Sequence, residues 1–255
     1  MNLTASDLIK KSIALYKQNF QLFFTYAFLI TLPSLAPALL SVIQSYFLAF
    51  QRSSLLESLF IALFVILSIF VYFAILWLSI AKVKVVAERY ENQPALSIRE
   101  EVHSAKKYIF PAFVATLIAG VFILLGFIAL IIPGVILSVL FSFVFYAVIL
   151  DNKKSADALK FSKNLVSGRW WAVLWRLFLP ALLFLVLSGL IKSLFGFFMR
   201  ITDLFLFDTI AAVAIYVVDI FFAPFVIAAQ VILYFELKKL KSVTAAPAPP
   251  VKTPL

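Results

Sequence analysis

The sequence predicts an all-α membrane protein, a polytopic helical bundle of six transmembrane helices in three hairpins, with amphipathic helices at the membrane interface. The first observation is that 64% of the residues are hydrophobic and 13% are charged, against about 45–50% and 25% in soluble domains. The second is that Phe110 to Leu150 contains no charged residue. One bilayer crossing takes about 20 apolar residues, so this stretch is long enough for two crossings.

The six expected spans are the apolar stretches between charged segments. They cover about residues 20–47, 58–81, 110–132, 134–150, 172–191 and 209–235. We expect a tight turn at Pro133 and Gly134, because proline removes a backbone donor and glycine tolerates a positive φ. Residues 1–241 would then form one membrane domain, and the proline-rich residues 242–255 a disordered cytoplasmic tail.

A short basic, amphipathic segment precedes each pair of spans. The three segments are 5–19, 98–108 and 151–169, and in each one aliphatic residues recur at helical spacing between lysines or arginines. Ser97 and Glu100 form a capping-box pattern that begins the second segment. The recurrence suggests three copies of one unit, an interfacial helix followed by a membrane hairpin.

Lysine and arginine gather on one side of the predicted spans. Of the 22 such residues, only Arg52, Lys192 and Arg200 fall on the other side. Positively charged loops stay in the cytoplasm, so we predict a multi-pass protein of the inner (cytoplasmic) cell membrane with both termini in the cytoplasm. Anionic lipid headgroups are a simpler partner than nucleic acid for these clusters. The expected headgroup contacts are Lys10, Lys11, Lys106, Lys107, Arg169 and Arg176.

Asp219 is the sharpest candidate for a functional residue inside a span. A carboxylate in the bilayer core costs a few kcal/mol, so it is expected to face other helices and to have a partner. One interpretation is proton or cation coupling, helped by a kink at Pro224. The other is a protonated or hydrogen-bonded carboxyl group that holds helices together, and this second interpretation is favoured because no other predicted span contains a buried charge.

The sequence predicts neither an enzyme nor a metal or cofactor site. Cysteine is absent and there is one histidine, His103, which we expect to be solvated on the charged face of a helix. Glu100 and Glu101 lie beside it without another ligand at a matching spacing. Phosphate-binding loops, dinucleotide-binding glycine motifs and serine elbows are also absent.

Four runs carry a resemblance to a known family. They are Tyr16–Phe20 (YKQNF), Leu130–Leu137 (LIIPGVIL), Ala158–Trp171 (ALKFSKNLVSGRWW) and Leu233–Leu237 (LYFEL). Together they resemble the six-span glycerophosphoryl diester phosphodiesterase membrane domain family, which includes stand-alone uncharacterised prokaryotic integral membrane proteins. The resemblance covers nearly the whole chain to about Lys241 and implies the six-span fold. It does not imply phosphodiesterase activity, which belongs to a separate soluble barrel with a His-Arg-Gly motif that this chain lacks.

These observations predict a non-catalytic scaffold or accessory module that binds membrane lipids or a partner protein. The alternative is a transporter or lipid-handling permease that uses Asp219, supported by prolines within spans and by internal repetition. Gly120, Gly126 and Gly134 permit close helix approach, either within the chain or at the face of a homo-oligomer, and the sequence leaves both open.

Overall fold

Helices make up the secondary structure of the residues described, which in this computed structural model are 3–50, 54–94, 96–202 and 205–245. Within these ranges the side chains of 34, 35, 37–39, 41, 42, 45–50, 195, 198–202, 205–217, 219–221 and 243–245 are not described. The elements are α1 (Ala5–Gln18), α2 (Phe20–Phe50), α3 (Ser54–Tyr90), α4 (Ile98–Ala105), the 3₁₀ turn η1 (Lys106–Tyr108), α5 (Ile109–Ala129), α6 (Ile131–Leu140), α7 (Val144–Asp151), α8 (Ser155–Val166), α9 (Trp170–Thr202) and α10 (Phe205–Ala245).

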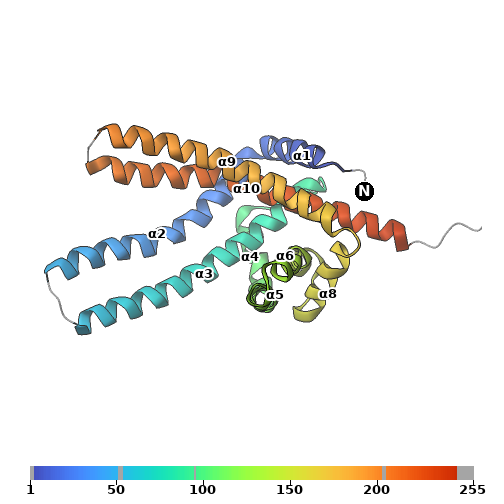
Figure 1. The fold of residues 1–255 in the computed structure, drawn as a ribbon, viewed down its shortest axis with the longest axis horizontal. Helices are drawn as coiled ribbons and strands as arrows, with labels where there is room; N and C mark the ends of the chain where they lie inside the picture. The colour runs from blue at the N-terminus through green and yellow to red at the C-terminus, as the bar shows by residue number, and fades with distance from the viewer. Residues whose placement is uncertain (1–2, 51–53, 95, 203–204, 246–255) are drawn as a thin grey trace, which may run out of the picture.

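Neighbouring long helices pack in pairs that point in different directions (Figure 1). α2 packs along α3, α5 along α6, and α9 along α10. The first and last pairs run across the view, whereas α5 is seen nearly end-on. The pairs meet at one end of the molecule, with α1, α4, η1, α7 and α8, and we call this end the hub. The N-terminus and the end of α10 lie on the same side of the molecule as the hub.

Four helical segments are long and apolar enough to cross a membrane. They are Ser54–Tyr90, Ile98–Ala129, Ile131–Asp151 and Trp170–Leu194, found among the described residues. Leu63, Phe70 and Leu124 are among their many exposed apolar side chains. Since lipid tails are as apolar as leucine, such helices need no protein partner along their length. These lengths and compositions indicate a membrane protein.

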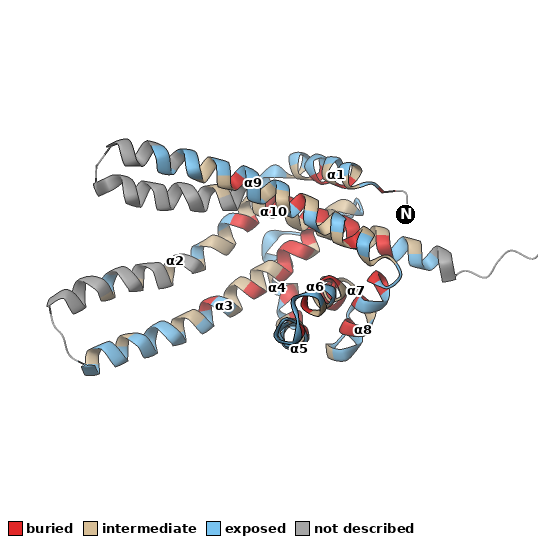
Figure 2. Ribbon diagram, in the orientation of Figure 1, coloured by how far each residue is buried: buried red, intermediate tan, exposed pale blue. Residues whose placement is uncertain are grey.

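Among the described side chains, the packed core is densest in the hub (Figure 2). Buried residues concentrate in the charged end of α3 from Ile80 to Ala87, in α7, in α8, and in α10 from Ala228 to Leu237. The apolar part of α3 ends at Ala81. Lys82 follows directly, is only 5% exposed, and has its pKa lowered to about 8 by burial.

The amphipathic helices begin at capping boxes and turn their apolar faces toward the hub. Thr4 and Asp7 form the box that begins α1, and Ser97 and Glu100 form the predicted box that begins α4. In α1 the buried positions are Leu8, Ser12 and Leu15, whereas Ile13 is 37% exposed. α1 packs on α9 and α10.

The turn between α5 and α6 falls at Leu130, so the prediction of a turn at Pro133 and Gly134 is wrong. Leu130 is extended, with φ −168° and ψ 157°, and α6 begins at the next residue. Pro133 lies in the first turn of α6, where a missing N–H removes no helical hydrogen bond. Pro133 thus belongs to the first turn of the second helix and not to the turn between the two helices.

Gly126 and Gly134 bring α5 and α6 into close contact. A Cβ atom on Gly126 would lie 3.0 Å from the Cα of Gly134, and one on Gly134 would lie 2.4 Å from the Phe127 ring. A Cβ on Gly120 would meet nothing within 4 Å. Of the two interpretations left open by the sequence, packing within the chain explains Gly126 and Gly134.

The predicted fourth span, 134–150, is not one continuous helix. It is broken at residues 141–143, between α6 and α7. Ser162 on α8 stabilises the break, because its hydroxyl donates to the Leu140 carbonyl at 2.7 Å and accepts from the Phe143 amide at 3.2 Å. A side chain from another helix thereby satisfies two backbone groups that the break would leave unpaired.

Candidate lipid-headgroup site

The basic residues predicted to contact lipid headgroups lie in two different settings. Lys10 and Lys11 are exposed on α1, and the Lys11 ammonium lies 3.5 Å from the Glu236 carboxylate of α10. The Lys11 side chain is 49% exposed and the Glu236 side chain 22% exposed, so solvent and salt screen their mutual attraction.

Lys106 and Lys107 lie at the base of the α5–α6 hairpin. Both are exposed in η1, and each ammonium lies over an aromatic ring, Lys106 5.2 Å from Trp77 and Lys107 4.9 Å from Tyr108. Trp77 also donates to the Val102 carbonyl at 2.6 Å. Aromatic rings and long basic side chains with a wet tip are typical of a membrane–water boundary.

A basic cavity of about 230 Å³ opens beside Lys107, between the start of α5 and the end of α7. Its lining residues are Lys107, Tyr108, Pro111, Val148, Asn152, Lys153 and Lys154. Three lysines from two segments distant in sequence thus line one space, and we call these three lysines the lysine site. None of the three forms an ion pair with a described residue.

The backbone after α7 positions two of these lysines. Asn152 adopts a left-handed conformation with φ 53°, and the Lys153 amide bonds back to the Ala147 carbonyl at 3.1 Å. This turn ends α7 and directs the chain toward α8. Lys153 also lies 5.8 Å from the Phe161 ring.

The nearest acidic residue in sequence is engaged elsewhere. Asp151, at the end of α7, accepts a hydrogen bond from Tyr234 and forms an ion pair with Lys238, both on α10. These contacts occupy both of its carboxylate oxygens. The lysine site therefore keeps a net positive charge suited to a phosphate.

Arg169 and Arg176 differ from the exposed lysines. Arg169 is half-buried where α9 begins. Arg176 donates to the Leu3 carbonyl through two nitrogens, at 2.8 and 2.6 Å, and to the Ala172 carbonyl at 2.8 Å. Arg176 thus holds the N-terminal segment against α9. A contact with a lipid headgroup, as predicted, would have to use the guanidinium N–H groups that these three bonds leave free.

A second polar cluster joins α3 to α4 inside the hub. Lys84 lies 2.9 Å from one oxygen of Glu101 and 2.5 Å from the Ser104 hydroxyl. Glu101 is 1% exposed, and its other oxygen has no hydrogen-bond partner among the described residues. Burial, and then the neighbouring Glu101, raises the pKa of Glu88 to about 7.

Asp219 and His103 are the other residues that the sequence analysis singled out. Asp219 lies within α10, but its side chain is outside those that the structure describes, as is the tail 246–255. α10 itself continues through Ala245, beyond the predicted domain end at 241. His103 is exposed, as expected, and the described residues contain no group of three potential metal ligands.

Sequence reasoning identified Lys107 but missed Lys153 and Lys154 as part of the same site. The available signal was the run Asp151-Asn-Lys-Lys154 directly after a predicted span. Comparison of the chain with protein-family models, with curated proteins and with solved structures found no match. The functional argument therefore depends on the residues and their geometry.

Proposed function

We propose that the protein is a non-catalytic integral membrane module that binds anionic phospholipid headgroups at its hub. In this proposal the paired helices are three membrane hairpins, the hub faces the cytoplasm, and the resemblance to the six-span membrane domain family reflects a shared fold. The observation that carries the proposal is the lysine site, where three lysines that form no ion pair with a described residue line a cavity at the base of an apolar hairpin.

The position of the cavity supports a lipid over a soluble anion. Pro111 and Val148 add apolar walls to the three lysines, and the exposed apolar residues of α5 lead away from them, among them Leu117 and Val121. A phospholipid would place its phosphate against the ammonium groups while its acyl chains follow α5. Each basic residue near an anionic membrane surface contributes about 1 kcal/mol, so three would favour anionic over neutral lipid by about 3 kcal/mol, or about 100-fold.

The test is lipid binding to the purified protein by native mass spectrometry, with phosphatidylglycerol and phosphatidylcholine as probes. The variant Lys107→Gln/Lys153→Gln/Lys154→Gln removes the lysine site. The control Lys160→Gln/Lys163→Gln/Lys241→Gln removes the same charge from exposed positions outside the cavity.

We expect the wild-type protein and the control to retain one tightly bound phosphatidylglycerol that the first variant loses. Phosphatidylcholine should bind weakly to all three proteins. Equal losses in the two variants would mean that overall charge, and not this cavity, attracts the lipid, and the proposal would then fail.

A further inference from the structure

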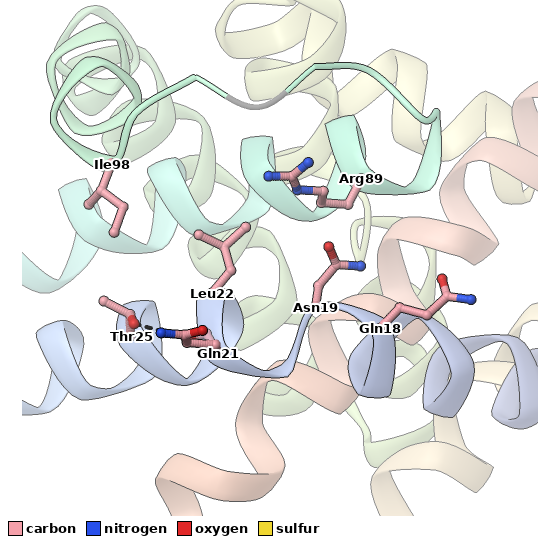
Figure 3. A pocket seen from close by; sticks show the side chains of 7 residues that line it. All are labelled: Gln18, Asn19, Gln21, Leu22, Thr25, Arg89 and Ile98. Carbon is pink, nitrogen blue, oxygen red and sulfur yellow. Dashed lines mark hydrogen bonds between the residues drawn. The ribbon is translucent and has the colours of Figure 1, made fainter.

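We propose a second binding site, for a phosphate group, in the cavity between the α1–α2 junction, the end of α3 and the start of α4. The cavity has a volume of about 390 Å³, within the range of small-molecule sites. Gln18, Asn19, Gln21, Leu22, Thr25, Arg89 and Ile98 line it (Figure 3). It shares no residue with the lysine site, so neither proposal depends on the other.

Arg89 supplies the charge in this cavity. Figure 3 shows its side chain extending from α3 over Leu22. Its guanidinium forms no hydrogen bond or ion pair with any described residue. A planar guanidinium with free N–H groups binds phosphate through two parallel hydrogen bonds, which a lysine cannot reproduce.

One carboxyl group interacts electrostatically with Arg89. It belongs to Glu88, which faces Lys84 on its own helix and Glu101 on α4. Because burial raises the pKa of Glu88 to about 7, this carboxyl group neutralises its surroundings less at neutral pH than an ordinary glutamate would. The Arg89 guanidinium, which is always charged at this pH, therefore remains available to a ligand.

The other polar walls are neutral amides and a hydroxyl group. The Asn19 amide points from the α1–α2 junction toward α3, and one of its N–H groups already bonds to the Leu15 carbonyl at 3.1 Å. Its oxygen can therefore accept from a ligand. Thr25 donates to the Gln21 carbonyl at 2.8 Å, which leaves the Gln21 side chain available to a ligand.

This arrangement fits a phosphate ester of a polyol, with phosphate at Arg89 and hydroxyl groups at the amides. Leu22 and Ile98 form an apolar side of the cavity, next to the long apolar helices α2 and α3. The ester could belong to a lipid headgroup or to a soluble molecule such as glycerol 3-phosphate. The shared chemistry is a phosphate on a hydroxylated carbon chain.

The experiment measures binding of phosphatidylglycerol and of glycerol 3-phosphate to the full chain by native mass spectrometry. Arg89→Gln removes the charge, and Arg89→Lys keeps the charge without the planar fork. Arg99→Gln is the matched control, because Arg99 is an exposed arginine of α4 that does not line the cavity.

We expect Arg89→Gln to weaken binding of at least one probe by about tenfold or more, Arg89→Lys to weaken it less, and Arg99→Gln to leave it unchanged. Loss of the lipid alone identifies a headgroup site, and loss of the soluble ester alone identifies a metabolite site. Unchanged binding in Arg89→Gln, or an equal loss in Arg99→Gln, overturns the inference. Should Arg89→Gln not fold, wild-type affinity in a folded Arg89→Lys protein also overturns it. Because the lysine site is intact in these variants, failure here leaves the lysine-site proposal standing.

Discussion

Lys84 joins α3 to α4 through contacts that exist only in the folded hub. Its side chain is 16% exposed, that of Glu101 is 1% exposed, and their charged groups lie 2.9 Å apart. A buried charge that loses its partner is strongly destabilising, whereas an apolar pair in the same space is often tolerated. Breaking this ion pair therefore measures how much it contributes to the stability of the packing of α4 on α3.

We predict that Lys84→Met lowers the free energy of unfolding by about 3 kcal/mol, because it leaves Glu101 buried without its cation. The double variant Lys84→Met/Glu101→Met should recover most of this loss. Thermal unfolding in nanodiscs followed by circular dichroism measures both, with the exposed Lys163→Met as control. Equal unfolding temperatures for Lys84→Met and Lys163→Met would show that the pair does not stabilise the hub.

Stability should also depend on pH through Glu88. Burial and the adjacent Glu101 raise the pKa of Glu88 from 4.5 to about 7. The folded protein then binds this proton more tightly than the unfolded chain, so the free energy of unfolding falls as pH rises from about 4.5 to about 7 and is level above. Unfolding temperatures measured across this range should therefore decrease with pH.

Glu88→Gln should flatten this dependence, because glutamine does not titrate. His103→Gln, which removes the only imidazole of the chain, should keep it. If the pH dependence survives in Glu88→Gln and disappears in His103→Gln, then Glu88 is not the residue whose titration changes the stability.

The position of a single residue in a site was predictable from the sequence only where it depends on neighbouring residues in the chain. Lys107 follows an amphipathic segment and precedes an uncharged stretch, so its exposed position at the base of the α5–α6 pair could be predicted. Lys153 and Lys154 required knowledge that α7 ends beside α5. Arg89 required the α1–α2 junction to lie against α3, a contact that no periodicity in the sequence indicates.

At the scale of the helices, the close packing of α5 against α6 depends on the small size of Gly126. Gly126→Ala would place a methyl group 3.0 Å from the Gly134 backbone, so the helices would have to separate. We expect a lower unfolding temperature, from a loss of about 1–3 kcal/mol. Gly120→Ala meets open space and should be neutral or slightly stabilising, because alanine favours helix. Equal effects of the two substitutions would contradict close packing at Gly126.

Helix positions followed well from the sequence, and helix ends less well. The capping box at Ser97 was predicted, and α1 and α8 lie within the predicted amphipathic segments. The break at 141–143 was missed because Ser162, which stabilises it, lies on another helix. The turn at Leu130 was missed because Pro133 was expected to end a helix, whereas it lies in the first turn of α6.

For the whole molecule, the prediction concerns which side of the membrane the hub faces. The chain contains no cysteine, so single cysteines can be introduced cleanly. With the hub in the cytoplasm, Lys17→Cys, His103→Cys and Lys163→Cys should react with an impermeant maleimide only after the cytoplasmic side is opened. Glu57→Cys, at the far end of α3, should react in intact cells. Reaction of any hub cysteine in intact cells would contradict the shared orientation.

The all-helical class and the apolar character were predictable because composition and periodicity determine them. The divergence of the helix pairs in Figure 1 was not predictable, because hydropathy gives the length of an apolar helix and not its direction. Directions are set by contacts in the hub, such as those of Ser162 and Arg176, which link segments distant in sequence.

The turn at Leu130 bears on how the protein enters its membrane during synthesis. Leu130, Ile131 and Ile132 are about 70% exposed, and the whole stretch Phe110–Leu150 lacks a charge. An ionic side chain carried to the bilayer centre costs about 2.5–3.5 kcal/mol on insertion scales. In the proposed orientation, the segment joining α2 to α3 contains Arg52 and would have to carry that charge through, whereas the α5–α6 tip carries none. The middle hairpin would then insert from the cytoplasmic side as one preformed unit, with the basic residues at its base left behind and setting its depth.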